Sequence, residues 1–203
     1  MAYMVALEFL PFFSVVIPTF NRAGLLGVAL RSVLQQTCPD FELIVVDNGS
    51  TDETKISISR IGDSRIRYIY QEGSGSPASP RNHGILEARG NWIVFLDSDD
   101  TWDPRKLEVT QRKLSATSCD FLVHQQRLVN SQGQIRGFMG PEENNLTYQN
   151  LLLTENKIAT SSVAIRREFL QANNLMFNES TRYAAVEDYD LWLRVLAVGG
   201  CPG

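Results

Sequence analysis

Short apolar runs alternate with one-sided apolar stripes along the first half of the chain. Residues 14–17 (SVVI) are almost continuously apolar and end at Pro18, a pattern typical of a strand buried on both faces. Between residues 25 and 34 apolar positions recur at helical spacing, which predicts a helix with one buried side. Because the same two signals return further along, strands and helices are predicted to alternate.

The remaining elements follow from the same patterns. Further strands are predicted at residues 41–46, 66–70, 92–96, 121–124 and 161–165. Further helices are predicted after Ser50, at residues 81–88, from Pro104 to 115, near Leu151 and at residues 189–198. Ser50 and Glu53 match the S-x-x-E capping box, which is expected to open the second helix. Residues 125–145 are predicted to be an irregular polar stretch.

Alternating strands and helices predict an α/β fold. We expect a Rossmann-like, doubly wound and mostly parallel sheet with helices on both faces, because crossover helices cover both sides of parallel strands. Ligands of such sheets bind beyond the C-terminal ends of the strands. The polar loops after the first, second and fourth strands are therefore expected to line one crevice, with Asn21, Asp47, Asn48, Asp97 and Asp99.

Composition narrows the possible partners. The chain has 203 residues, 43% of them apolar, which suits one domain with its own core. A net charge of -4 without any Lys/Arg run gives no electrostatic footprint for nucleic acid or for an anionic membrane. No stretch reaches the roughly 18–20 apolar residues of a membrane span. We therefore expect a protein without a transmembrane segment whose partners are small molecules.

The segment FLDSDD, residues 95–100, carries the sharpest chemical signal. Side chains alternate along an extended chain, so Asp97 and Asp99 can point the same way and share one hard divalent cation, Mg²⁺ or Mn²⁺. Such a cation would neutralise a diphosphate leaving group. A lone D-x-D is more often an acidic turn that caps a helix, so the surrounding motifs decide between the two.

Four segments together resemble family 2 glycosyltransferases, which have the GT-A fold. They are VVIPTFNR, VVDNGSTDET, PRNHGILEARGNWIVFLDSDD and EDYDLWLRV, in the family's order and spacing, and the match spans residues 14 to about 198. The resemblance implies an inverting, metal-dependent transfer from a nucleoside diphosphate sugar to an acceptor hydroxyl. It also implies synthesis of polysaccharide, lipopolysaccharide or another cell-surface glycan.

The resemblance further implies how the chain is organised. One catalytic domain, residues 1–203, is expected to have a nucleotide-binding half at about 14–118 and an acceptor and base half at about 119–203. Relatives continue beyond this point, so the chain is expected to be C-terminally truncated. The donor would be a uridine, deoxythymidine or guanosine diphosphate sugar, and the acceptor a glycan or a lipid-linked molecule. We expect a cytoplasmic location, peripheral to the cytoplasmic face of a membrane.

Family roles fall on the matching positions. The loops after the first and second strands hold the nucleobase and ribose, so the donor site would include Pro18, Thr19, Asn21, Asp47 and Asn48. Asp97 would contact ribose and the metal diphosphate, and Asp99 the metal.

Asn48 departs from the family pattern, because many relatives have an aspartate there. Its amide oxygen can still accept a hydrogen bond from a pyrimidine ring N–H. Alternatively, Asn48 is a turn residue that tolerates a left-handed conformation before Gly49.

Two further residues have competing interpretations. Asp188 matches the second member of the family's ED motif, which implies the general base, whereas acidic residues at a helix start are also favoured by the helix dipole alone. Arg81, at the start of a predicted helix, could reach the diphosphate or could be an exposed surface arginine.

Two other function classes stay open. A non-catalytic nucleotide-sugar-binding module or an inactive fragment is possible, since the chain stops soon after the helix that carries Asp188. A nucleotidyltransferase is less favoured, because no Gly-rich basic loop follows the first strand. A dinucleotide oxidoreductase is disfavoured, because PTFNR stands where G-x-G-x-x-G would be required.

Overall fold

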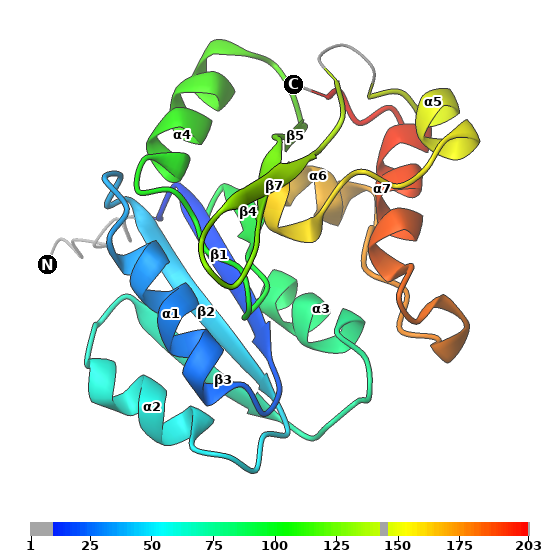
Figure 1. The fold of residues 1–203 in the computed structure, drawn as a ribbon. Coiled ribbons are helices and arrows are strands. Elements are labelled where there is room, and N and C mark those ends of the chain that lie inside the picture. The colour runs from blue at the N-terminus through cyan, green and yellow to red at the C-terminus, as the bar shows by residue number, and fades with distance from the viewer. Residues whose placement is uncertain (1–9, 143–145, 203) are drawn as a thin grey trace, which may run out of the picture.

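The computed structural model describes residues 10–142 and 146–202 (Figure 1). The strands are β1 Phe13–Thr19, β2 Phe41–Asn48, β3 Ile66–Gln71, β4 Trp92–Phe95, β5 Phe121–Val123, β6 Gln126–Val129, β7 Ile135–Met139 and β8 Val163–Arg166. The helices are α1 Ala23–Leu34, α2 Thr54–Ile61, α3 Ala78–Glu87, α4 Lys106–Ala116, α5 Tyr148–Leu153, α6 Arg167–Ala172 and α7 Glu187–Ala197. Two short 3-10 turns, η1 Thr160–Ser162 and η2 Thr181–Tyr183, complete the described elements.

A six-stranded sheet forms the centre of the molecule. Its strand order is β3-β2-β1-β4-β8-β5, with β1, β2, β3 and β4 parallel and β8 antiparallel to both of its neighbours. Thr19 lies opposite Asp47, and Asp47 lies opposite Tyr70, so the first three strands end level with one another. The predicted α/β, mostly parallel sheet is confirmed.

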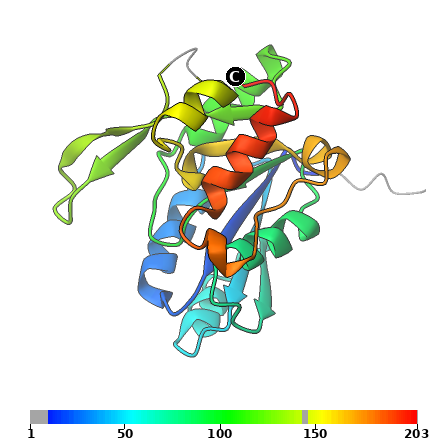
Figure 2. The same ribbon diagram turned by 90° about the vertical axis from the view of Figure 1, so that its right-hand side faces the viewer.

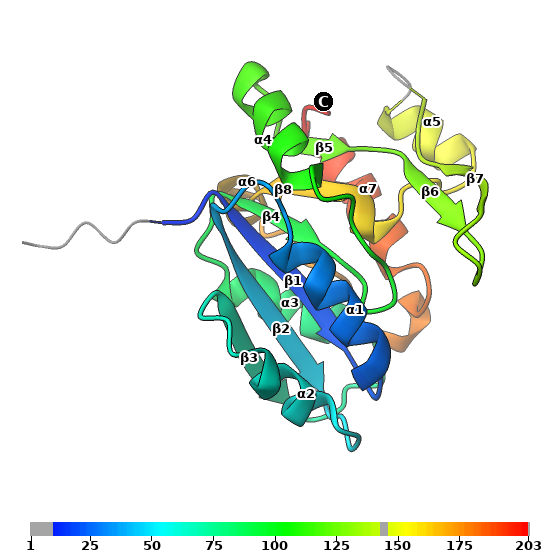
Figure 3. The same cartoon turned by 60° about the vertical axis from the view of Figure 1, so that its left-hand side comes forward.

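Helices cover both faces of this sheet. Figures 1 and 3 show α1 and α2 on one face and α3 on the other, and two separate hydrophobic clusters confirm this division. Successive residues of β1 belong to different clusters, Val15 to the α1 side and Val16 to the α3 side. Both faces of β1 must therefore be apolar, which explains its uninterrupted run of β-branched residues.

Two elements were not expected from the sequence. Strands β6 and β7 form a hairpin within the stretch predicted to be irregular, and the short helix α6 follows β8 directly. The hairpin turns at Gly133, whose φ is 76°, and Asn130 Oδ1 accepts hydrogen bonds from the amides of Gln132 and Gln134. Because both faces of the hairpin are largely exposed, its strands lack the alternation that reveals a half-buried strand.

The predicted capping box at Ser50 and Glu53 is wrong. Ser50 Oγ instead accepts a hydrogen bond from the amide of Asn21, and α2 begins only at Thr54. Asp52 Oδ1 accepts the Thr54 amide at 3.0 Å and thereby satisfies a donor at the helix start. Helix α3 also begins three residues earlier than predicted, at Ala78.

The described helices include no membrane crossing. Each of those found in residues 10–142 and 146–202 falls short of the length and apolar character that a bilayer span requires.

Helix α3 approaches β1 closely at Gly84, and this contact yields a testable prediction. A Cβ at Gly84 would overlap the γ-methyl groups of Val16 on the buried side of the sheet. Gly84→Ala is expected to lower the free energy of unfolding by about 1–3 kcal/mol, measured by chemical denaturation. In the control Gly24→Ala, the new methyl meets no atom within 4 Å, so stability should be unchanged or up to about 1 kcal/mol higher. Equal effects of the two substitutions would contradict the close packing.

Candidate active site

A cavity of about 610 Å³ opens at the C-terminal ends of β1 and β4. Six of the residues expected at the site line it: Pro18, Thr19, Asn48, Arg81, Asp97 and Asp99. Its far wall is the loop that contains Gly73, Gly75, Ser76 and Pro77. A further cavity of about 530 Å³, beside Trp92, Leu114 and Arg166, contains none of the expected residues. The first cavity is therefore the candidate donor site.

Asn21 ties two loops together and does not line this cavity. It has a left-handed backbone, with φ 50°, and its Oδ1 accepts the amide N–H of Thr51 at 2.8 Å. Its own amide donates to Ser50 Oγ at 2.9 Å. These long-range bonds turn its side chain toward the β2–α2 loop, and the predicted role of Asn21 in donor binding stays a prediction.

Asp47 points into the fold and likewise does not line the cavity. Its exposed fraction is 1%, Oδ1 accepts the Ser50 amide at 2.8 Å, and Oδ2 accepts the Tyr68 hydroxyl at 2.7 Å. Burial and the Asp47 carboxylate together raise the pKa of Tyr68 well above its ordinary value. One carboxylate oxygen of Asp47 thus holds the β2–α2 turn and the other holds β3, and its predicted role in donor binding stays a prediction.

Asn48 lines the cavity and also fixes its far wall. Its Oδ1 accepts from Gln71 Nε2 at 2.9 Å and from the Ser74 amide at 3.1 Å, and its Nδ2 donates to Ser76 O at 3.3 Å. The left-handed conformation belongs to Gly49, with φ 88°, so the interpretation of Asn48 as a left-handed turn residue is wrong. A nucleobase N–H would have to share an oxygen that already accepts several donors.

Arg81 is buried in the first turn of α3 and bridges two carboxylates. One guanidinium nitrogen donates to Asp97 Oδ1 at 2.7 Å and another to Glu187 Oε1 at 2.8 Å. Its side chain is 6% exposed, so the interpretation as a surface arginine is wrong. Burial opposes the charge of Arg81, but Asp97 and Glu187 outweigh it and raise the pKa of the guanidinium. Arg81 thus connects the cavity to the start of α7.

The two carboxylates of the D-x-D segment differ in exposure. Asp99 Oδ2 pairs with Arg22 at 2.7 Å, and both side chains are about half exposed, 47% and 48%. Asp97 is held by Arg81 and by its amide, which donates to Ser161 Oγ at 3.0 Å. Each carboxylate keeps one oxygen without a donor among the described residues, and both line the cavity. Two such hard oxygen ligands suit a divalent cation that takes its remaining ligands from a diphosphate.

The described residues contain no ready-made metal cage. No group of three or more His, Cys, Asp or Glu side chains is arranged to hold an ion within the ranges 10–142 and 146–202. The third aspartate of the motif, Asp100, does not line the cavity. Burial raises its pKa, and the nearby Ser161 and Gln126 side chains act in the opposite direction.

Asp188 lies in the first turn of α7, next to the partner of Arg81. Its Oδ1 accepts the Tyr189 amide at 2.6 Å, and its Oδ2 accepts Thr160 Oγ1 at 3.3 Å. Burial raises the pKa of Asp188, although the Tyr189 amide and the Arg81 charge act in the opposite direction. A carboxylate that binds protons more tightly than usual is suited to act as a general base.

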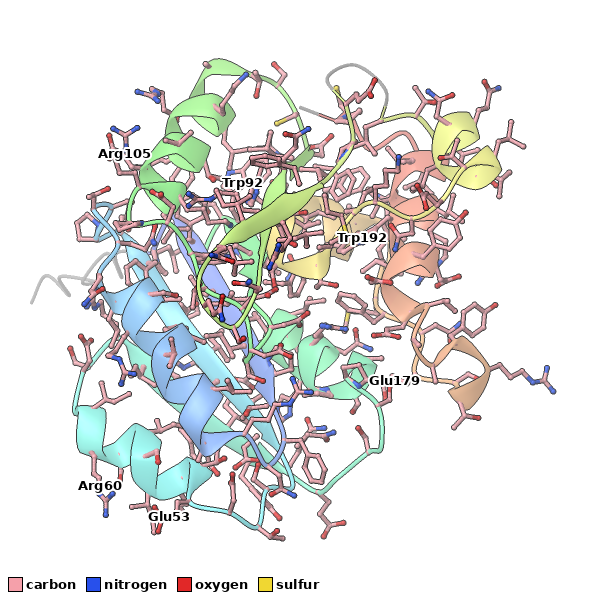
Figure 4. All side chains as sticks on the ribbon, in the orientation of Figure 1. Glu53, Arg60, Trp92, Arg105, Glu179 and Trp192 are labelled. Carbon is pink, nitrogen blue, oxygen red and sulfur yellow. The ribbon has the colours of Figure 1, made fainter. Side chains whose placement is uncertain are left out.

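Trp192 anchors the helix that carries Asp188. Its indole is fully buried, stacks on Phe121 with ring centroids 5.4 Å apart, and meets Phe177 edge-on at 5.8 Å (Figure 4). Since Trp192 lies one helical turn after Asp188, this packing fixes the helix axis and with it the carboxylate. A sugar-binding role for Trp192 is excluded by its burial.

Several site residues gave no sequence signal. Glu187 is 106 positions from Arg81, and the pairing of the two could not be deduced from their local motifs. Thr160 and Ser161 lie in η1 just before β8, and no motif of the sequence pointed to a role for them at the site. Arg22 ends the PTFNR segment that begins at the end of β1, and only this position pointed to the site.

The fold and the strand-end carboxylates define a glycosyltransferase domain of the GT-A type. The chain covers 94% of its length on the crystal structure of S. aureus TarS 1-349 in complex with UDP-GlcNAc, with a TM-score of 0.78 and 24% identity. It matches mannosyltransferase PcManGT from Pyrobaculum calidifontis, in complex with GDP-Man and Mn2+, with a TM-score of 0.67 and 20% identity over 96% of the chain. These likenesses establish the fold.

The chain belongs to glycosyl transferase family 2, whose family model matches residues 14–172. It is 31% identical over 183 residues to the Escherichia coli UDP-Glc:alpha-D-GlcNAc-diphosphoundecaprenol beta-1,3-glucosyltransferase WfgD, covering 90% of this chain and 69% of that protein. It is 33% identical over 193 residues to the putative teichuronic acid biosynthesis glycosyltransferase TuaG of Bacillus subtilis, covering 93% and 73%.

The chain is shorter than the proteins it matches. It spans 54% of the TarS chain and 55% of the PcManGT chain.

The raised pKa of Asp188 predicts how stability depends on pH. The folded protein keeps this proton to a higher pH than the unfolded chain, so stability falls as pH rises from the unfolded pKa, about 3.9, through the folded pKa. Asp188→Asn removes the buried charge and can still accept from the Tyr189 amide. It is expected to melt at a higher temperature than the wild type at about pH 8, with a difference that shrinks toward about pH 4.

The matched control for this experiment is Asp190→Asn on the same helix. Asp190 pairs with Arg194 at 2.6 Å, so its neutralisation should give no such gain at about pH 8. Thermal unfolding followed by circular dichroism compares the variants. A lower melting temperature of Asp188→Asn at high pH would show that ionised Asp188 stabilises the fold.

Proposed function

We propose that the protein transfers a sugar from a nucleoside diphosphate sugar to an acceptor hydroxyl with inversion at the anomeric carbon. The observation that carries this proposal is the buried Arg81 bridge, which joins the cavity carboxylate Asp97 to Glu187, the neighbour of the candidate base Asp188. Through Arg81, the donor carboxylate Asp97 and the helix that carries Asp188 are held in a fixed relative position. The division into a donor half, about 14–118, and an acceptor half, about 119–203, remains a prediction.

The comparisons support a uridine diphosphate sugar as donor. TarS was crystallised with UDP-GlcNAc, and the name of WfgD gives UDP-Glc as its donor. We retain deoxythymidine and guanosine diphosphate sugars as alternatives, since PcManGT was crystallised with GDP-Man. The nucleoside would enter between Pro18 and Thr19 on one side and Asn48 on the other, where the cavity is lined by the ends of β1 and β2.

The acceptor we propose is lipid-linked and belongs to cell-surface glycan synthesis. The name of WfgD gives a diphosphoundecaprenol-linked sugar as acceptor, and TuaG is named for teichuronic acid biosynthesis. Both names describe those proteins, and they support the same class of acceptor here. A position at the cytoplasmic face of a membrane follows from such an acceptor.

Asp188 performs the proton transfer in this mechanism. The acceptor oxygen attacks the anomeric carbon while its proton passes to an Asp188 carboxylate oxygen, and the bond from that carbon to the diphosphate oxygen breaks on the opposite face. One displacement inverts the anomeric centre. Burial raises the pKa of Asp188, which strengthens it as a base, while Arg81 favours the ionised form that accepts the proton.

Asp97 and Asp99 would hold a divalent cation, Mn²⁺ or Mg²⁺. When bound, the cation supplies charge neutralisation for the diphosphate leaving group. Arg22 and Arg81 also line the cavity, so the chain places two positive side chains beside the same phosphates. Binding at Asp99 requires only that the exposed Arg22 side chain shares or leaves this carboxylate.

The metal assignment predicts the behaviour of Asp99→Asn. This variant is expected to fold normally, since Asp99 is about half exposed, but to lose the Mn²⁺-dependent part of its UDP affinity. Isothermal titration calorimetry with UDP, with and without MnCl₂, measures this part directly. Glu53→Gln, an exposed acidic residue at the start of α2, is the control and should bind as the wild type does. Undiminished Mn²⁺-dependent affinity in Asp99→Asn would remove Asp99 from the metal site.

The base assignment predicts a separation of binding from turnover in Asp188→Asn. Affinity for UDP and Mn²⁺ should stay near the wild-type value, because proton transfer occurs only in the transition state. Sugar transfer should fall by roughly 10²–10⁴-fold. The control Asp190→Asn should keep both properties. Transfer is measured with radiolabelled UDP-sugars and diphosphate-lipid acceptors.

Two results of that experiment would argue against the proposal. If Asp188→Asn transfers sugar at the wild-type rate, the base lies elsewhere. If the wild type binds UDP-sugars but transfers none of them to any offered acceptor or to water, the chain is a nucleotide-sugar-binding module.

A further inference from the structure

The β6–β7 hairpin projects from the body of the molecule as an arm, defined here as residues 126–139 (Figure 2). All of these residues are described, and not one of their side chains is buried. The two strands make their main contacts with one another, and neither contributes to the two hydrophobic clusters of the fold. An isolated two-stranded hairpin is only marginally stable in water, so a surface that covers one face of the arm would stabilise it.

One face of the arm is strongly apolar. The pairing places Arg127 opposite Phe138 and Val129 opposite Ile135, and residues two apart on β6 share a face. The exposed fractions are 58% for Val129, 52% for Ile135 and 64% for Phe138. The register shifts between Leu128 and Val129. Three large apolar side chains are therefore exposed close together within one short hairpin, and such a patch marks an interaction site.

The charge of the arm is opposite in sign to that of the whole chain. Residues 126–139 contain Arg127 and Arg136 and no Asp or Glu, whereas the chain carries a net charge of -4. Arg127 makes only a long contact with Asp103, 3.4 Å, between two side chains that are more than half exposed. The two cations are thus available for an external anionic surface, although the chain as a whole has no basic footprint.

This combination distinguishes between possible partners. In a dimer that pairs the two arms across a two-fold axis, arginines without any acidic partner within the arm would face each other. An anionic lipid surface takes up apolar side chains below the headgroups and attracts arginines at the headgroup level. The observed set of residues matches the lipid surface.

We propose that the arm docks on an anionic membrane, with Val129, Ile135 and Phe138 in the interface and Arg127 and Arg136 at the headgroups. This inference rests on the proposed function, because docking of the arm would bring the catalytic cavity to an acceptor in the membrane. At the root of the arm, Arg127 makes a long contact of 3.4 Å with Asp103, four residues after Asp99. The arm therefore lies beside the loop that carries the candidate metal ligands.

Vesicle flotation tests the proposal with the whole chain and with no donor or acceptor present. The wild type is expected to bind vesicles of phosphatidylcholine with about 30% phosphatidylglycerol, and to bind far less to phosphatidylcholine alone. Arg127→Gln and Arg136→Gln should each weaken binding about fivefold. The double variant Val129→Ser/Phe138→Ser should weaken it by about tenfold or more, because its apolar face is lost.

Matched controls lie elsewhere on the surface. Leu86→Ser on α3 removes an apolar side chain that is 74% exposed, and Arg60→Gln on α2 removes an exposed cation. Both should bind vesicles as the wild type does. Since the arm contains no buried residue, its variants should also melt at the wild-type temperature, which separates docking from folding.

Three results would overturn the inference. They are wild-type binding that does not depend on phosphatidylglycerol, vesicle binding that the arm substitutions leave unchanged, and a dimer in light scattering that the arm substitutions dissociate. Titration of the wild type with UDP and Mn²⁺ in solution does not involve vesicles. If the wild type binds UDP but not vesicles, the proposed docking of the arm is contradicted and the proposed function is not. If the wild type does not bind UDP, the proposed function is contradicted.

Discussion

The buried guanidinium of Arg81 is the interaction on which the arrangement of this site depends. It bonds Asp97 after β4 and Glu187 at the start of α7, so three elements that are far apart in sequence meet at one side chain. Removing one partner from a buried ion pair typically destabilises a protein by about 3–5 kcal/mol, because the remaining charge is left uncompensated. The two carboxylates and the arginine must therefore occur together. Donor side and base side cannot shift independently while this bridge is intact.

Helix α3 can place Arg81 there because one side of the helix is buried against the sheet and the segment before α7. Gly84 lets it approach β1, and Asn82 bonds the backbone of Phe177 in both directions, at 2.8 and 2.9 Å. Phe177 in turn packs against Trp192, which fixes α7. A continuous set of contacts thus runs from the first strand of the sheet to the helix of Asp188. Core packing thus positions the helix that carries Asp188, the proposed base, and hydrogen bonds from Tyr189 and Thr160 orient its carboxylate.

The sequence predicted the features that depend on local patterns and missed those that depend on long-range side-chain contacts. Uninterrupted apolar runs located the buried strands, and the position of Asp97 and Asp99 at a strand end placed them correctly in the cavity. The sequence did not show that Asn21 and Asp47 bond to residues 50–52 and to Tyr68, bonds that turn their side chains away from the cavity. The hairpin was missed for a different reason. Strands exposed on both faces need no alternation, and the polar turn at residues 130–134 leaves only two short apolar segments beside it.

The two arginines beside the D-x-D carboxylates make different contributions because their exposure differs. The pair of Arg22 and Asp99 is about half exposed, and such a pair contributes only about 0–1 kcal/mol, so a ligand can replace Arg22 at little expense. The pair of Arg81 and Asp97 is held on the buried side and cannot open without leaving a charge unpaired. Ligand entry therefore rearranges the Arg22 side of the cavity and leaves the Arg81 side unchanged. Asp188, the proposed base, is connected to the Arg81 side and would keep its position while the proposed donor side adapts, so that its placement would add no reorganisation to the barrier of the proposed transfer.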